Sequence, residues 1–107
     1  MKLETIHSLA AALIRGKIEA NKFAESDDGG TSNFDTPALI LGSEWSEEAI
    51  QRAFSLAGLR PYKITKRIYH VLDAVQGQGY RRTYMAQAFR DSLKTSGYNA
   101  VVDYRID

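Results

Sequence analysis

Helix-like and strand-like periodicities alternate along this chain in one order, and that order limits its fold more than any other feature. Apolar residues recur every three to four positions in residues 2–24, which predicts a helix. Residues 25–36 are rich in Gly, Ser, Asp and Asn and predict a flexible polar loop. A second helix is predicted between Ser46, a good N-cap, and Gly58, and a third over residues 80–96.

Four short segments predict β-strands. The first is the apolar run of residues 38–41. The second and third, residues 59–64 and 67–73, follow one another through a tight turn. Residues 100–106 alternate apolar and polar side chains and predict the last strand.

From residue 37 to residue 107 these elements follow the order β-α-β-β-α-β, which is typical of a ferredoxin-like fold. We therefore predict one α+β domain over residues 1–107. It comprises the N-terminal helix (residues 1–24), the polar loop, and a four-stranded antiparallel sheet with two helices on one face. The prediction also sets the first and third strands side by side and parallel at the centre of the sheet.

Composition excludes several classes of protein. The 107 residues suffice for one compact domain, and the absence of cysteine excludes disulfides, thiol nucleophiles and thiolate zinc sites. No apolar run approaches the roughly 18 residues of a membrane span. The N-terminus also lacks the regions of a signal peptide. We therefore expect a cytoplasmic protein with no membrane partner.

The formal net charge of +1 hides an uneven distribution of charge. Residues 1–55 contain five basic and nine acidic residues, a net charge of −4. Residues 56–107 contain nine basic and four acidic residues, a net charge of +5, and all six tyrosines. Such asymmetry indicates a surface that binds a partner, unless folding brings the two halves together and their charges compensate.

The predicted topology brings two loops to one end of the sheet. Residues 42–45 follow the first strand and residues 76–79 follow the third. Each leads into a helix N-terminus, whose free N–H groups suit an anion. Arg81 and Arg82 would oppose the dipole of their helix, so a negative group should accompany them. The candidate binding residues here are Gln76, Gln78, Tyr80, Arg81, Arg82 and, at the rim, Trp45.

Two kinds of negative group could fill this position. One is a phosphate from a nucleotide or a nucleic-acid backbone. The other is internal, supplied by the acids that begin the neighbouring helix: Glu44, Glu47 and Glu48. Trp45 also has a structural alternative, because it could pack against Ile50 as a hydrophobic staple.

Basic and aromatic residues interleave over residues 60–94. Lys and Arg neutralise phosphates and aromatic rings stack on bases. Tyr and Arg also dominate protein-binding hot spots, and the same mixture suits a solvated surface. We expect Tyr69 to point outward, away from the side chains that alternate with it, Ile68, His70 and Leu72. The further candidate binding residues are Lys66, Arg67, Tyr69 and Arg90.

No common enzyme motif is present: there is no Gly-x-Ser-x-Gly elbow, Walker loop or His-Glu-x-x-His pattern. We therefore predict no catalytic residue, metal or cofactor. Two enzyme alternatives stay open. Residues 75–82, VQGQGYRR, are similar to the pyrophosphate loop of N-acetyltransferases, although Ala74 stands where that loop has glutamine or arginine. A metal-independent nuclease would use His70 with Tyr80 and Arg81.

In general texture the chain resembles small accessory proteins of temperate bacteriophages, including anti-CRISPR-type inhibitors. The segments that carry the resemblance are residues 32–41, SNFDTPALIL, and residues 77–93, GQGYRRTYMAQAFRDSL. It implies a stand-alone, non-enzymatic domain that binds and occludes a host protein complex in the host cytoplasm. A protein partner is our first hypothesis, a nucleic acid or phosphate ligand the second, and a small enzyme the third. The apolar N-terminal helix and the open sheet edges also suggest a homodimer.

Overall fold

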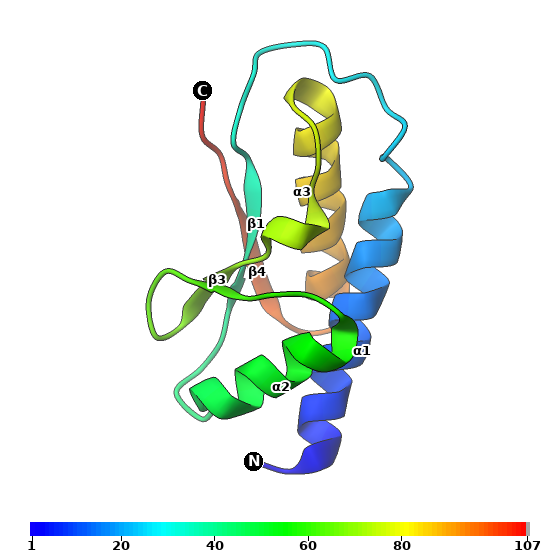
Figure 1. Ribbon diagram of the computed structural model, residues 1–107. Coiled ribbons are helices and arrows are strands. Elements are labelled where there is room, and N and C mark those ends of the chain that lie inside the picture. The colour runs from blue at the N-terminus through cyan, green and yellow to red at the C-terminus, as the bar shows by residue number, and fades with distance from the viewer. Residues whose placement is uncertain (107) are drawn as a thin grey trace.

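The computed structural model describes residues 1–106 and shows an α+β chain (Figure 1). The helices are α1 (Leu3–Asn21), α2 (Glu47–Ala57) and α3 (Gly79–Thr95). The strands are β1 (Thr36–Ile40), β2 (Tyr62–Lys63), β3 (Ile68–His70) and β4 (Asn99–Asp103). A short 3₁₀ helix, η1 (Leu72–Ala74), follows β3. Within the described residues, no helix has the length and apolarity to span a membrane.

The four strands form one antiparallel sheet in the order β2-β3-β1-β4. The prediction that the first and third strands run parallel is wrong, because β1 and β3 pair in opposite directions. The cause is the β2–β3 hairpin. Strand β2 runs in the direction of β1, and the hairpin then turns the chain back. The loops that leave β1 and β3 consequently emerge at opposite ends of the sheet.

The helix-facing side of the sheet is set by the strand register. Leu39 of β1 lies opposite Tyr69 of β3 and Ala100 of β4, and all three are buried. Tyr69 is only 2% exposed, so the prediction that it points outward is wrong. Alternation shows which residues share a face, but apolar side chains occupy both faces of β3. The sequence therefore left open which face is buried. Leu72, predicted to share a strand face with Ile68 and His70, lies in η1 and is 45% exposed.

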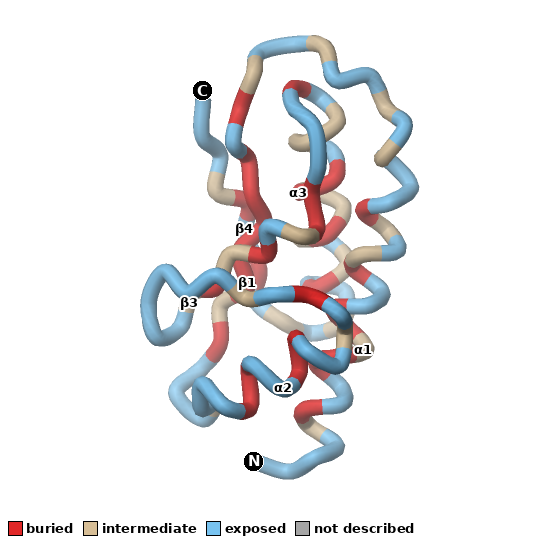
Figure 2. The backbone as a smooth tube through the Cα atoms, in the orientation of Figure 1, coloured by how far each residue is buried: buried red, intermediate tan, exposed pale blue. Residues whose placement is uncertain are grey.

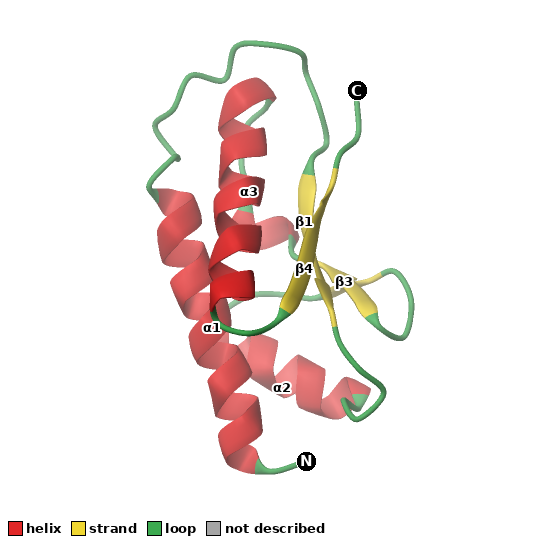
Figure 3. Ribbon diagram, turned by 180° about the vertical axis from the view of Figure 1, so that it is seen from behind, coloured by secondary structure: helices red, strands yellow, loops and turns green. Residues whose placement is uncertain are grey.

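Helix α3 lies on β1 and β4, and α1 packs against α3 and α2 (Figures 1 and 3). Only α3 makes an extensive contact with the strands, whereas the main contact of α2 is with α1. Gly16 allows α1 to approach α3 closely, since a Cβ there would lie 2.9 Å from the Phe89 ring. Buried residues concentrate on β1, on β4 and on the inner faces of the helices (Figure 2).

Candidate functional site

The polar loop between α1 and β1 packs over the first turn of α3 (Figure 1). The backbone N–H of Tyr80 donates a 2.9 Å hydrogen bond to the Gly29 carbonyl. The Asn33 side chain donates one of 3.0 Å to the Gly79 carbonyl, and Asn33 is buried. The composition predicts a flexible polar loop, but these hydrogen bonds show that part of the loop is packed against α3. The first turn of α3 needs hydrogen-bond acceptors, and this loop supplies one of them.

Asp35 is the centre of this contact. One oxygen of its carboxylate accepts a 2.6 Å hydrogen bond from the Thr83 hydroxyl, and the other accepts a 2.9 Å bond from the backbone N–H of Arg105. Among the described residues, no buried side-chain nitrogen or oxygen lacks a hydrogen-bond partner. The network is therefore complete without a ligand. We call the loop and its hydrogen bonds to α3 the loop clamp.

Arg81 and Arg82 are part of the loop clamp. The Arg81 Nε donates a 2.9 Å hydrogen bond to the Ser26 carbonyl. The Arg82 Nε donates one of 2.8 Å to the Asp35 carbonyl, and its Nη2 donates one of 3.1 Å to the Thr36 hydroxyl. Burial lowers the pKa of the Arg82 guanidinium from its ordinary value, an effect that the nearby Asp35 charge partly offsets. Both side chains thus hold the loop in place.

The internal alternative for these arginines, pairing with Glu44, Glu47 and Glu48, is wrong. Glu47 forms an ion pair with Lys63. The N-termini of α2 and α3 lie at opposite ends of β1: Arg82 contacts Thr36 at its start, whereas α2 follows its end. The antiparallel pairing of β1 and β3 therefore separates the two loops, and the two-loop site does not form.

The other predicted binding residues are scattered. Trp45 packs half-buried against the core beyond the end of β1. Lys66 and Arg67 are exposed in the turn between β2 and β3. Near α3, Gln76 is exposed and Tyr80 stacks on Tyr84. The side-chain Oε1 of Gln78 accepts a hydrogen bond from the Ser32 hydroxyl.

Part of the basic segment of residues 60–94 is neutralised within the chain. Ion pairs join Arg60 to Asp73 at 2.9 Å and Arg90 to Asp91 at 2.8 Å. The hydrogen bonds from Arg60 lower the pKa of Asp73 and raise that of Arg60. Both of these acids belong to the basic half, so the ion pair that offsets the asymmetry between the halves is the one between Lys63 and Glu47.

The nuclease alternative is not supported by the geometry. His70 lies on the face of the sheet opposite the helices, because its neighbour Tyr69 faces them, and its Nε2 is 3.1 Å from Asp103. Tyr80 and Arg81 belong to α3, on the helix side. Within residues 1–106, no three His, Asp or Glu side chains cluster in a way that could hold a metal ion.

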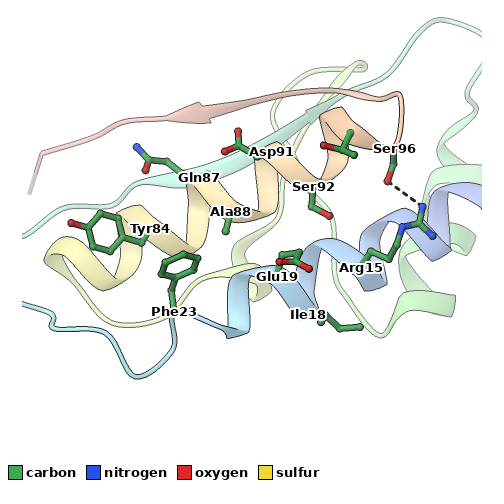
Figure 4. A pocket seen from close by; sticks show the side chains of 11 residues that line it. Arg15, Ile18, Glu19, Phe23, Tyr84, Gln87, Ala88, Asp91, Ser92 and Ser96 are labelled. Atoms are coloured by element: carbon green, nitrogen blue, oxygen red, sulfur yellow. Dashed lines mark hydrogen bonds between the residues drawn. The ribbon is translucent and has the colours of Figure 1, made fainter.

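A groove of about 580 Å³ runs between α1 and α3 on the outside of the molecule (Figure 4). The two helices are antiparallel here, so Phe23 lies across from Tyr84 and Arg15 across from Ser96. The groove is apolar at one end, where Phe23 and Tyr84 are 39% and 43% exposed, and Ile18, which is 54% exposed, lies nearer to Arg15 (Figure 4).

The other end of the groove is polar. The Arg15 Nη2 donates a 3.1 Å hydrogen bond to the Ser96 hydroxyl. Two carboxylates also line the groove, those of Glu19 and Asp91, with side chains 45% and 64% exposed. This combination of exposed apolar side chains and rim charges suits a peptide or protein segment.

One feature of the sequence indicates this groove, although the predicted binding site did not include it. Residues 2–24 carry apolar side chains on more than one side of the helix. A helix that packs on one side only needs a single stripe, so the surplus marks exposed apolar surface, of which Ile18 and Phe23 line the groove.

The chain has no detectable match among protein-family models, curated proteins or solved structures.

Proposed function

We propose that this chain is a small non-enzymatic binding protein that engages another protein through the groove between α1 and α3. The observation that carries the proposal is the exposure of two aromatic side chains, Phe23 and Tyr84, in one groove. Apolar and aromatic side chains exposed together indicate an interaction surface, and tyrosine is enriched in binding hot spots.

The proposed occupant is an amphipathic helix of the partner. Two packed helices form a trough into which a third helix fits, with anchors spaced three and four residues apart. Its apolar anchors would contact Phe23 and Tyr84. Its polar side chains would meet Arg15, Glu19 and Asp91, and the two carboxylates already pair within the chain, Glu19 with Lys22 and Asp91 with Arg90.

The resemblance to phage-encoded anti-CRISPR-type proteins makes this proposal more specific. The partner would be a host protein complex in the host cytoplasm, inhibited by occlusion. We also propose that the sheet is of ferredoxin-like type, which the strand order β2-β3-β1-β4 supports. The crossing of α2 onto α1 would be a departure from that type.

Nucleic-acid binding is the second candidate, and Lys66 and Arg67 are the residues that favour it. Both are exposed near Tyr62, which is 58% exposed. If it holds, nucleic-acid affinity should fall steeply with salt and with K66A/R67A. The case is weaker than for a protein partner, because Arg60, Lys63, Arg81, Arg82 and Arg90 already have partners in the chain.

The proposal is tested by filling the groove. Ala88 lines it half-buried, and Ala88→Arg would place a long side chain where the partner helix is expected. The tagged chain should capture a specific protein from its native host, and the purified proteins should bind one another. Ala88→Arg should abolish this binding, whereas Leu56→Arg, on the exposed side of α2, should retain it.

Two outcomes would overturn the proposal. Equal binding by the Ala88→Arg variant would mean that the groove is not the site. Recovery of the chain with nucleic acid instead of protein, lost in K66A/R67A, would favour the second candidate.

A further inference from the structure

Helix α1 carries a second face, apolar except for His7, besides the one that packs into the core. The buried face comprises Ile6, Leu9, Ala10, Ala12, Leu13, Gly16 and Ala20. The second face, which we call the α1 ridge, comprises Leu3, His7, Ala11, Ile14 and Ile18. Their spacing of four, four, three and four residues places them on one side of the helix. Leu3, Ile14 and Ile18 are 48%, 43% and 54% exposed.

We propose that the α1 ridge binds the α1 ridge of a second copy of this chain, with the two helices antiparallel. The register follows from the spacing of the ridge. Leu3 would lie opposite the partner's Ile18, and His7 opposite the partner's Ile14. Both pairs share one midpoint, between Ala10 and Ala11, so a two-fold axis there superposes the ridge on itself.

The side chains fit this register in size. The large residues Leu3 and Ile18 occur at the two ends, about 22 Å apart at ~1.5 Å per residue. The small residue Ala11 lies next to the axis, where the two backbones would approach most closely. A self-complementary patch of this kind is what a two-fold dimer requires.

Charge complementarity also favours a second copy. Glu4 follows Leu3 and Arg15 follows Ile14, so both lie on the same side of the ridge. In an antiparallel pair related by a two-fold axis, the same sides of the two ridges meet. Glu4 would therefore face the partner's Arg15, displaced along the axis by two residues or about 3 Å. Within the described chain, Arg15 has a hydrogen bond to the neutral Ser96 hydroxyl but no ion pair.

The oligomeric state is the first test. Sedimentation equilibrium of the full chain should give twice the 12.0 kDa mass, and Ile14→Lys should return it to 12.0 kDa. Ile14 is exposed, so the thermal unfolding temperature of the variant measured at low concentration should stay close to the wild-type value. Leu56→Lys on α2, with a side chain of similar exposure, should remain a dimer.

Cysteine cross-linking tests the antiparallel register, and the absence of native cysteine makes the result unambiguous. Ala11→Cys should form an interchain disulfide, because the two Ala11 positions lie beside the axis. Leu3→Cys alone should not, but a mixture of Leu3→Cys and Ile18→Cys chains should cross-link to one another. Glu4→Lys and Arg15→Glu should each weaken the dimer, and the double variant should restore it.

A monomeric wild-type chain at all concentrations would overturn the proposal. So would a dimer that survives Ile14→Lys, or a Leu3→Cys chain that links to itself. Ile18 and Arg15 belong to both surfaces, but Ala88 lies only in the groove and Ile14 only in the ridge. Ala88→Arg should therefore leave the mass unchanged, so the two proposals fail separately.

Discussion

The first turn of α3 and the groove between α1 and α3 lie on the same helix, but their side chains are used in opposite ways. At the first turn, Arg81 and Arg82 bind the carbonyl oxygens of Ser26 and Asp35 and so belong to the loop clamp. One turn further on, Tyr84 is 43% exposed. Charged residues at a helix N-terminus thus serve the fold here, and apolar residues carry the open surface. The two regions differ because the polar side chains of the first turn already have hydrogen-bond partners, whereas the Tyr84 ring remains exposed.

The largest effect is expected from Gly79→Ala, which breaks the loop clamp. A Cβ at Gly79 would lie 2.0 Å from the Gly29 carbonyl oxygen, and the residue has φ +60°. We expect a loss of at least about 3 kcal/mol in the free energy of unfolding, measured by urea denaturation. Gly58→Ala is the matched control, since Gly58 has φ +72° but nothing within 4 Å of its Cβ position. It should cost about 1–2 kcal/mol.

A Gly79→Ala variant no less stable than Gly58→Ala would show that the loop moves away from α3 at little cost. The first turn of α3 would then be accessible to a ligand, and the contrast between the two regions would disappear.

The next effect concerns Arg82. Arg82→Ala removes donors to the Asp35 carbonyl and the Thr36 hydroxyl, so the free energy of unfolding should fall by about 1–2 kcal/mol. Arg67→Ala, in the exposed turn between β2 and β3, should change it by no more than about 0.5 kcal/mol. If Arg82→Ala instead left stability unchanged and abolished binding of inorganic pyrophosphate in calorimetry, Arg82 would be a ligand-binding residue.

Tyr84→Ala should show the reverse pattern. The ring is exposed and contacts Phe23 and Tyr80, so its loss should cost about 1 kcal/mol or less of stability. Affinity for the captured partner should fall at least about tenfold, as for other hot-spot tyrosines. Phe34→Ala removes another ring, 53% exposed and outside the groove, and should leave that affinity unchanged. A large loss of stability with unchanged affinity would place Tyr84 with the structural residues.

The sequence allowed the helices and the presence of four strands to be predicted, because their signals are local. Ser46 is the N-cap of α2, and its hydroxyl accepts a hydrogen bond from the Ala49 N–H. Gly58 adopts the left-handed conformation that ends α2. The first strand begins two residues earlier than predicted, whereas the other three were predicted too long. Pro61, which has no N–H, precedes β2, and η1 follows β3 closely.

The site could not be predicted in the same way, because it depends on contacts between distant segments. Arg82 and Asp35 are 47 positions apart, and local patterns do not show that the loop reaches α3. Because β3 was predicted to run parallel to β1, Trp45 was predicted to lie beside residues 76–79. The groove depends on which side of α1 packs against α3. That side is the one carrying Gly16, because the absence of a side chain there leaves room for the Phe89 ring.

The smallest effect tests whether the basic segment is neutralised internally. The hydrogen bonds from Arg60 lower the pKa of Asp73 in the folded chain. The stability that this pair contributes should be complete above the ordinary aspartate pKa of about 3.9 and should disappear as the pH falls through the lower folded-state value. In Asp73→Asn this part of the pH dependence should be absent, as urea denaturation at neutral pH and below about pH 3 would show. The difference should be small because Arg60 is exposed, with a side chain 87% accessible.

If wild type and Asp73→Asn kept the same stability difference across the whole pH range, the Asp73 charge would contribute nothing to stability. Arg60 would then be as available to a partner as Lys66.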